Sequence, residues 1–414
     1  MDGIIISTKE NTKEIKLLAE SLGYKIRKEF IQRREYLTSF YIGKGKLEEA
    51  KRYVKENGIA IAFVNDALRP SQWFNLEKFL GINVYDRIRL ILEIFTDRAK
   101  RKEAKLQVKL AKLRYEKPFV RELFHRLKEG ERPGFLAGGE YVVADYYEMM
   151  KKQMKKIKEE LKKIEKERDL KRAERKEKGF YLISLAGYTN AGKSSLLNAL
   201  TESKVLVEKR VFSTLSTKTS KIKKSKSSIP LLLTDTVGFI KDLPHWLIDA
   251  FHSTLEEISL ADLVILLVDA SESIDEMKEK ALASIKEIYS LKEKPNIIVA
   301  LNKIDLIGKK EIEHKKREME KFVELKCIPI STKTGEGLNN LLDTIYDSLP
   351  KLYDIEITLP KAKINSFISW LYENAEISDF HFDGIAKLKI RCSERIKDKI
   401  IGRCKKMGGF VHGY

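Results

Sequence analysis

Residues 180–200 read FYLISLAGYTNAGKSSLLNAL, and this stretch decides the fold. The apolar run Phe180–Ala186 is typical of a buried strand. Gly187–Ser194 follows with the spacing GxxxxGKS, and the apolar run Ser195–Leu200 predicts a helix directly after it. Strand, glycine-rich loop and helix in this order predict a phosphate-binding loop (P-loop). Its glycines let backbone N–H groups turn toward a β-phosphate, and the helix N-terminus adds the positive end of its dipole.

The residues of this loop are candidate ligands of a nucleotide. We expect Lys193 to reach the β- and γ-phosphate oxygens and to be catalytic, and the Ser194 hydroxyl to bind Mg²⁺. A chance glycine-rich turn is the alternative, but the flanking strand and helix argue against it. The remaining candidates of the loop are Gly187, Tyr188, Thr189, Asn190, Ala191, Gly192 and Ser195.

A second motif ends the apolar run 231–238, LLLTDTVG, which has the form DxxG. We expect Asp235 to hold Mg²⁺ through a water molecule. The Gly238 N–H is expected to sense the γ-phosphate, which makes Gly238 a second catalytic candidate. Thr236 and Val237 lie between these two residues and complete the candidate GTP-binding segment.

A third motif, NKxD, ends the strand-like run 297–305, IIVALNKID. The Asp305 carboxylate can accept two hydrogen bonds, from the N1–H and the 2-amino group of guanine. Adenine lacks this pair, so the motif predicts GTP rather than ATP. We expect Asn302 and Lys303 to brace the loop and flank the base. A further base-binding loop is expected at Ser331, Thr332 and Lys333. Four such motifs in order, each at a strand end, predict a GTPase.

The 414 residues divide into four segments. Residues 1–97 alternate strand-like and helical patterns, which predicts an α/β N-terminal domain. Residues 98–178 are almost purely helical in pattern. Residues 179–348 hold the motifs above and predict a Ras-like P-loop GTPase (G) domain. Residues 349–414 read strand, helix, hairpin and helix, which predicts a small α+β domain. The fold class is therefore expected to be multidomain α/β.

The helical segment is expected to form a long hairpin. Its second half repeats apolar residues at steps of 4, 3, 4 and 3, at Met150, Met154, Ile157, Leu161 and Ile164. Residues 118–140 are rich in proline and glycine, and we expect them to interrupt the two helices. Residues 151–180 hold 14 Lys/Arg and 7 Asp/Glu. A solvated coiled-coil face and a direct contact with RNA both explain this excess.

Positive charge is the main signal in the composition. The chain has 80 Lys/Arg and 61 Asp/Glu, a formal net charge of +19. Such an excess predicts a polyanionic partner, RNA or DNA. Lys/Glu-rich surfaces are also common in proteins adapted to heat, which explains the density of charge but not the imbalance of sign.

Other classes of protein are disfavoured. No run approaches about 18 uninterrupted apolar residues, so no membrane span is expected. Met1–Ser7 lacks the basic start and long apolar core of a secretory signal. The three cysteines, Cys327, Cys392 and Cys404, are far apart, which argues against a disulfide scaffold or a zinc site. We expect a cytoplasmic protein, and a monomer, since the apolar seam can close within one chain.

Several strings resemble the HflX family of translational GTPases. In the G domain these are GYTNAGKSS at 187–195, FSTL at 212–215, LTDTVGFIKDLP at 233–244 and AFHSTLEE at 250–257. In the N-terminal half they are YIGKGK at 41–46, LRPSQWFNL at 68–76, DRIRLILEIFTDR at 86–98 and KLQVKLAKLRY at 105–115. The resemblance covers roughly residues 40–350, and the order of the segments also matches.

The resemblance implies GTP and GDP as ligands, Mg²⁺ as cofactor, and the large ribosomal subunit and its rRNA as partners. It further implies dissociation or rescue of stalled ribosomes. Spacing alone leaves Thr214, Thr217 and Thr219 open as the magnesium-binding threonine of switch I. The resemblance selects Thr214, which then also becomes a catalytic candidate. The switch I candidates are Phe212, Ser213, Thr214, Leu215 and Ser216.

One departure from the family leaves a second function open. The family carries a loop resembling GGxGxRGPGE between its long helices, and that loop is thought to reach into the large subunit. Residues 132–140 read RPGFLAGGE here and retain only GGE. The alternative function is a GTP-gated RNA-remodelling or ribosome-assembly factor that does not split ribosomes. Regulation of a protein partner without RNA contact is disfavoured by the net charge.

Two residues bear on the rate of hydrolysis. Phe239 stands where Ras-like enzymes have a glutamine that orients the attacking water, so slow hydrolysis is expected without a partner. Phe239 can equally be a hydrophobic anchor for switch II, and both interpretations can hold. Asn190 resembles the asparagine with which GTPases of pattern GxxNxGKS help to hold K⁺. The alternative is that Asn190 fits a tight turn of the P-loop.

Overall fold

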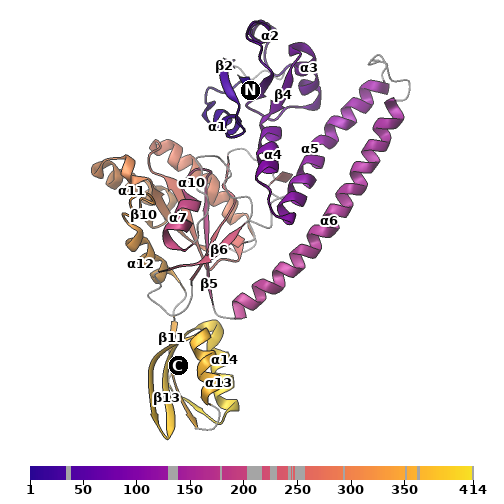
Figure 1. Ribbon diagram of the computed structural model, residues 1–414. Coiled ribbons are helices and arrows are strands. Elements are labelled where there is room, and N and C mark those ends of the chain that lie inside the picture. Colours follow the sequence, from indigo (N-terminus) through magenta and orange to yellow (C-terminus); the bar gives the residue numbers. More distant parts are fainter. Residues whose placement is uncertain are drawn as a thin grey trace. The chain divides into compact units, whose positions relative to one another are not determined.

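The computed structural model describes residues 1–33, 39–128, 139–177, 180–202, 217–223, 231–240, 244, 246–247, 257–291, 294–349, 352–360 and 364–412. The fold is multidomain α/β, as the sequence predicts (Figure 1). The chain separates into two compact units, of which the first contains Met1–Ile164 and the second contains most of the remaining residues. Within the described ranges, no helix is apolar over a stretch long enough to cross a bilayer.

The N-terminal part is a four-stranded parallel sheet of order β2-β1-β3-β4 with helices around it. The central strands carry β-branched residues such as Ile4, Ile5 and Ile6, which are fully buried because helices cover the sheet. The strands are β1 Asp2–Ser7, β2 Lys25–Ile31, β3 Ile61–Val64 and β4 Asn83–Asp86. The helices are α1 Lys13–Ser21, α2 Lys44–Asn57, α3 Pro70–Leu80 and α4 Arg87–Arg98.

Two long helices, α5 Lys102–Lys128 and α6 Gly139–Glu177, form the predicted hairpin (Figure 1). The predicted seam is confirmed, because apolar residues of both helices pack in one cluster. Its buried members are Leu110, Leu113, Met150 and Ile157, with Leu106, Val120, Met154 and Leu161 partly buried.

The expected break of the first helix at Pro118 is wrong, because α5 continues through Pro118 to Lys128. A proline inside a helix costs about 3 kcal/mol. The residues that follow explain why the helix continues: the Phe119 ring lies 5.4 Å from that of Trp73, edge to face, and Val120 joins the seam. Packing therefore outweighs the local preference. The glycine-rich residues 129–138 lie outside the described part of the chain.

The G domain has a six-stranded sheet of order β10-β9-β8-β5-β7-β6, in which only the edge pair β6–β7 is antiparallel. Separate apolar clusters cover its two faces. The strands are β5 Tyr181–Gly187, β6 Lys218–Lys221, β7 Leu231–Asp235, β8 Leu263–Asp269, β9 Asn296–Asn302 and β10 Cys327–Pro329. The helices are α7 Lys193–Leu200, α10 Ile274–Tyr289, η1 Ile304–Leu306, α11 Lys309–Val323 and α12 Leu338–Ser348.

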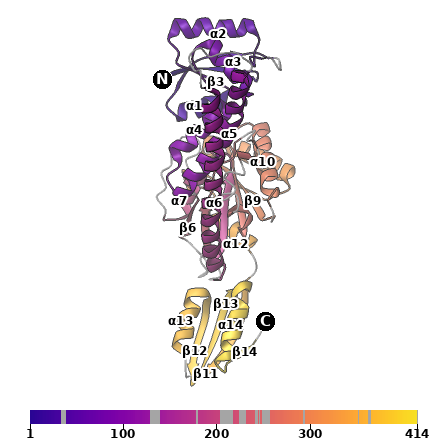
Figure 2. The same ribbon diagram turned by 90° about the vertical axis from the view of Figure 1, so that its right-hand side faces the viewer.

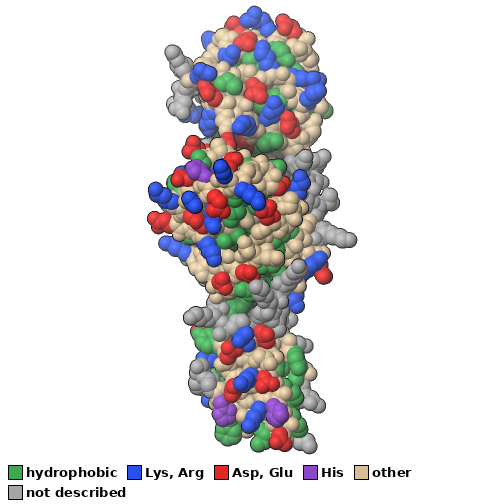
Figure 3. Space-filling view, turned by 90° about the vertical axis from the view of Figure 1, so that its left-hand side faces the viewer, with side chains coloured by type: hydrophobic (Ala, Val, Ile, Leu, Met, Phe, Trp, Pro, Cys, Tyr) green, Lys and Arg blue, Asp and Glu red, His purple; other side chains and the backbone are tan. Residues whose placement is uncertain are grey.

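The C-terminal part is the predicted small α+β unit, with one strand, β14, that the sequence pattern did not indicate. Its sheet has the order β12-β13-β11-β14 and is antiparallel throughout. Both helices cover one face (Figure 2), and charged side chains of both signs lie across the other (Figure 3). The elements are β11 Leu352–Pro360, α13 Ile364–Asn374, β12 Glu376–Asp383, β13 Ile385–Ser393, α14 Glu394–Lys406 and β14 Phe410–His412.

Candidate nucleotide-binding site

The candidate residues meet at one edge of the G-domain sheet. Strands β5, β8 and β9 are parallel neighbours, so the ends at Gly187, Asp269 and Asn302 lie side by side. Ligands of parallel sheets bind at such carboxyl ends. Gly187 has a φ of 135°, and a Cβ there would collide with the Leu267 carbonyl of β8. Only glycine therefore allows the chain to leave β5 at this point.

The P-loop turns sharply at Asn190, which has a φ of 65°, and at Gly192, which has a φ of 102°. A Cβ on Gly192 would collide with the Asn302 amide, so glycine is required by space as well as by φ. Asparagine tolerates the left-handed region better than most residues. The tight-turn interpretation of Asn190 is therefore confirmed, and a role in holding K⁺ stays a prediction.

Lys193 begins α7 and is buried beneath the P-loop. Its Nζ donates hydrogen bonds to the carbonyl oxygens of Gly187, at 2.9 Å, and Tyr188, at 2.8 Å. Burial lowers the pKa of Lys193 to about 8, although the nearby Asp235 carboxylate acts in the opposite direction. Lys193 thus holds the loop closed by binding the backbone carbonyl groups of the loop itself.

Ser194 and Asp235 lie together at the end of β7, both buried. The Ser194 Oγ donates a hydrogen bond of 2.7 Å to Asp235 Oδ2. A hydroxyl and a carboxylate side by side are oxygen ligands of the kind that Mg²⁺ prefers, so these residues fit the expected ion. Thr219 Oγ1 lies 2.9 Å from Thr234 Oγ1 within the β6–β7 pair, which argues against Thr219 as a switch I ligand. Thr214 and the other switch I candidates of 212–216 lie outside the described residues.

Switch II is attached to the P-loop by two backbone hydrogen bonds. The Phe239 N–H donates to the Gly187 carbonyl at 3.0 Å, and the Thr189 N–H donates to the Phe239 carbonyl at 2.9 Å. Gly238 is held so close that a Cβ there would lie 2.9 Å from Lys193 Nζ. Thr236, fully buried, donates its hydroxyl to the Leu185 carbonyl at 2.6 Å, which makes it a structural residue of this segment.

The Phe239 side chain packs into the apolar core beneath the sheet and is only 9% exposed. Its role as a hydrophobic anchor for switch II is therefore confirmed. The side chain offers no hydrogen-bonding group to a water molecule, and its buried position is compatible with the expected slow hydrolysis.

Asn302 links two of the predicted loops. Its Nδ2 donates to the carbonyl of Ala191 in the P-loop at 2.8 Å, and its Oδ1 accepts from the Thr332 N–H at 3.1 Å. The predicted bracing role is thus seen as two hydrogen bonds to segments about 30 and 110 residues away in the sequence. Because Asn302 is buried, these bonds are shielded from water.

Asp305 is oriented by the loop at 331–333. The Ser331 Oγ donates to Asp305 Oδ1 at 2.7 Å, and Lys333 Nζ lies 3.9 Å from Asp305 Oδ2. Ser331 in turn accepts a hydrogen bond from the Thr334 N–H. One carboxylate oxygen of Asp305 is therefore fixed by a neighbour, which sets the direction in which the carboxylate can meet a base.

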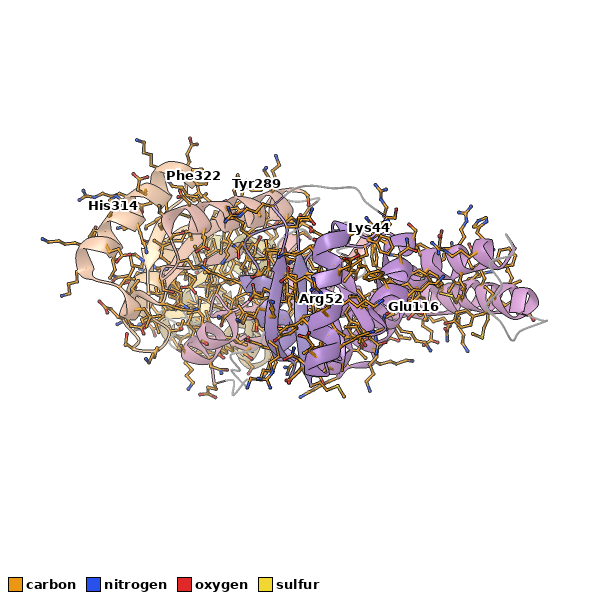
Figure 4. All side chains as sticks on the ribbon, turned by 90° about the horizontal axis from the view of Figure 1, so that it is seen from above. Lys44, Arg52, Glu116, Tyr289, His314 and Phe322 are labelled. Carbon is orange, nitrogen blue, oxygen red and sulfur yellow. The ribbon has the colours of Figure 1, made fainter. Side chains whose placement is uncertain are left out.

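Sequence reasoning missed Asp269, at the end of β8. Its Oδ2 lies 2.5 Å from Lys303 Nζ, so it holds the lysine of the NKxD motif in place. The available signal was its position directly after the apolar run 263–268, the same position that marks Asp235. The exposed aromatic side chains Tyr289 and Phe322 lie on the outer sides of α10 and α11 (Figure 4) and are not part of this site.

Four families of protein domain match the sequence. Residues 9–96 match the family described as GTP-binding GTPase N-terminal, and residues 98–175 match the GTP-binding GTPase Middle Region. Residues 182–303 match the 50S ribosome-binding GTPase family. Residues 318–408 match the HflX C-terminal domain.

Whole proteins match as well. GTPase HflX of Thermococcus kodakarensis is 41% identical over 409 residues, covering 96% of this chain and 91% of that protein. GTPase HflX of Methanocaldococcus jannaschii is 39% identical over 396 residues, covering 95% and 96%. A solved structure, a GTP-binding protein from the archaeon Sulfolobus solfataricus in complex with GDP, is 29% identical with a TM-score of 0.48, covering 84% of this chain and 98% of that one.

Proposed function

The chain belongs to the GTPase HflX family, and from this premise we propose that its GTP-bound form binds the large ribosomal subunit and that hydrolysis ends this binding. The observation that carries the proposal is the convergence of the P-loop, DxxG and NKxD segments on one sheet edge, with Asn302 bonded to two loops. The family matched by residues 182–303 supports the ribosome as partner.

The proposed phosphate site uses the backbone of the P-loop and the side chain of Lys193. On nucleotide binding, Lys193 exchanges its carbonyl partners for β- and γ-phosphate oxygens. Magnesium, when bound, offsets phosphate charge, and Ser194 and Thr214 would hold it, with Asp235 acting through water. The proposed GTP contacts are Gly187, Tyr188, Thr189, Asn190, Ala191, Gly192, Ser195, Phe212, Ser213, Leu215, Ser216, Thr236, Val237 and Gly238.

The proposed base site uses Asp305, which reads the N1–H and 2-amino group of guanine. Asn302 and Lys303 support the loop, and Ser331, Thr332 and Lys333 close the site from the neighbouring strand end. Asp305 then discriminates GTP from ATP, because adenine does not offer its carboxylate the N1–H and 2-amino donors of guanine.

The proposed switch follows from the contacts of Gly238. A γ-phosphate near Lys193 competes with the segment that Gly238 and Phe239 now occupy, so GTP favours a rearranged switch II. Slow basal hydrolysis, stimulated by the large subunit, fits the absence of a water-orienting side chain at Phe239. A potassium ion beside Asn190 is a proposed source of transition-state charge.

The four segments 1–97, 98–178, 179–348 and 349–414 are proposed as the functional division of the chain. The basic hairpin and the N-terminal domain contact rRNA, and the G domain makes this binding depend on whether GTP or GDP is bound. The second candidate, a GTP-gated RNA-remodelling or assembly factor, is favoured by one observation: residues 132–140 keep only GGE of the family loop.

Sedimentation separates the two functions. The protein is pelleted with purified large subunits in GDP and in a non-hydrolysable GTP analogue, and subunit splitting of intact ribosomes is followed in parallel. Binding only in the analogue supports the first function. Binding of a free structured RNA is measured in the same two nucleotides. Equal binding of this RNA in both nucleotides, without splitting of ribosomes, supports the second function.

A further inference from the structure

The C-terminal domain has the element order β-α-β-β-α-β and the sheet order β12-β13-β11-β14. This is the ferredoxin-like topology. In RNA-binding domains of this architecture, the open sheet face binds RNA by stacking bases on aromatic side chains of the central strands. The chemistry of the two faces of this domain therefore decides which of them can bind RNA.

The open sheet face is built differently here. On β13, Lys387, Lys389 and Arg391 alternate with buried residues and lie on this face. Arg391 pairs with Asp354 at 2.8 Å, and Lys389 pairs with Glu356 at 3.1 Å, both across the β11–β13 ladder. In these two described strands, no aromatic residue shares the face. The cations of the central strand are thus partly neutralised by their neighbours, and the two central strands offer no aromatic side chain for stacking. On the edge strand β14, Phe410 pairs with Thr358, lies on this face and is 71% exposed.

The opposite face carries the excess of positive charge. The four strands hold three Lys/Arg and five Asp/Glu, whereas α14 alone holds six Lys/Arg and two Asp/Glu. The two faces of this small domain therefore have opposite net charge. A polyanion is attracted to the helical face and repelled by the sheet face.

The geometry of α14 directs its charges outward. Ile396, Ile400 and Cys404 are fully buried at steps of four and face the sheet. Exposed basic residues lie between and beyond them on α14. The Arg403 guanidinium stacks on Trp370 of α13, 4.1 Å from the ring centroid. We define the α14 face as Lys399, Arg403, Lys405, Lys406 and Trp370.

We propose that the α14 face binds the phosphate backbone of structured RNA, and that the open sheet face does not. This inference rests on the proposed function, since that function makes ribosomal RNA the RNA that the protein meets. Basic residues in a last helical turn also complement the helix dipole. That effect does not explain the stacking of Arg403 on the Trp370 ring, and a cation beside an aromatic ring is a combination that fits RNA.

The test compares two full-length variants with the same loss of charge in the same domain. The first is Arg403→Gln, Lys405→Gln, Lys406→Gln, and the control is Lys387→Gln, Lys389→Gln, Arg391→Gln. A fluorescein-labelled RNA hairpin is titrated at several salt concentrations. We expect the α14 variant to lose affinity on the order of tenfold at low salt, with a salt slope reduced by about 3. The control is expected to match the wild type.

Equal behaviour of the two variants, or a larger loss in the control, overturns the inference. Because Arg403 also stacks on Trp370, a double variant, Lys405→Gln with Lys406→Gln, keeps that contact, and Lys387→Gln with Lys389→Gln is its control. Large-subunit pelleting in the GTP analogue is measured in parallel. If the wild type fails to pellet, the proposed function fails while the hairpin titration still decides the inference. If the α14 variant loses pelleting but binds the hairpin normally, the partner is a protein and the inference is wrong.

Discussion

The Thr189 N–H donates a hydrogen bond to the Phe239 carbonyl at 2.9 Å, so the phosphate loop is bonded to switch II in this structure. The reciprocal bond runs from the Phe239 N–H to the Gly187 carbonyl, and the Phe239 ring is anchored in the core. Backbone N–H groups of a P-loop are the donors that hold phosphate oxygens. Nucleotide binding therefore has to compete with a contact inside the chain.

Removing the anchor is expected to free the loop. In Phe239→Ala the ring that holds switch II is lost, so we expect GTP to associate faster than with the wild type. The same change should lower the free energy of unfolding by about 3–5 kcal/mol, as for other buried phenylalanines. Stopped-flow fluorescence of a labelled GTP analogue measures the first effect, and chemical denaturation measures the second.

Phe239→Leu is the matched control, since it keeps an apolar side chain of similar size and typically costs less than about 1.5 kcal/mol. We expect it to bind at nearly the wild-type rate. An Ala variant that folds and also binds at the wild-type rate would show that the anchor does not restrain switch II.

Nucleotide choice is expected to depend on Asp305. In Asp305→Asn one acceptor becomes an amide donor facing the donors of guanine, so GTP binding should weaken by roughly 2–4 kcal/mol. Xanthosine triphosphate, which has a carbonyl in place of the 2-amino group, should bind the variant better than GTP does. Competition against labelled GDP measures both affinities.

Lys333→Ala is the control for this change, because Lys333 lies 3.9 Å from the same carboxylate and its side chain is 80% exposed. A small effect is expected there, since exposed ion pairs contribute about 0–1 kcal/mol. Unchanged GTP affinity in Asp305→Asn would remove residues 302–305 from the base site.

The core of the site was predictable because its motifs are local. The strand 181–187, the P-loop and α7 follow one another in the chain, and the glycines at 187 and 192 are dictated by φ. The bond from Asn302 to Ala191 was not predictable in detail, since 111 residues separate the two positions. The ion pair between Lys303 and Asp269 was not predictable for a similar reason, because the sequence marks the end of each strand but not which strand ends are neighbours.

In the helical hairpin, the sequence predicted a break that the structure does not have. Pro118 is a strong local signal for a break, yet the tertiary contacts of Phe119 and Val120 keep α5 continuous. Strand β14 was missed because its three residues, Phe410–His412, are too few to show alternation. It forms because β11 offers a free edge. Packing partners distant in sequence decide both cases.

The pH dependence of binding is expected to follow Lys193. Burial lowers its pKa from 10.5 to about 8. Between these values the unfolded chain keeps a proton that the folded chain has lost, so the free energy of unfolding of the nucleotide-free protein rises with pH. A bound phosphate raises the pKa of Lys193 again, so GDP binding should take up a proton above pH 8 and weaken by up to about tenfold per pH unit.

Titration calorimetry at pH 8.5 in two buffers of different ionisation enthalpy measures this proton uptake directly. Lys193→Met has no proton to take up at this position and should show none, although its affinity will be lower. Equal uptake in the variant and the wild type would assign the proton to another group. No uptake in either would contradict the lowered pKa.

Hydrolysis is expected to be slow in the isolated protein, to rise with large ribosomal subunits, and to rise more in K⁺ than in Na⁺. The first expectation follows from Phe239, which cannot orient water, and the last from a cation beside Asn190 that offsets charge between the β- and γ-phosphates. Because Asn190 has a φ of 65°, its replacement must preserve the turn. Asn190→Gly keeps this conformation and removes only the side-chain amide.

Phosphate release is measured in matched KCl and NaCl, with and without large subunits. The wild type should be faster in KCl, and Asn190→Gly should lose that difference while still binding GDP. Equal rates of the wild type in both salts would exclude the cation role of Asn190 and leave only its part in the turn. Fast turnover of the isolated protein in either salt would instead contradict the argument from Phe239, because some other group would then have to orient the water.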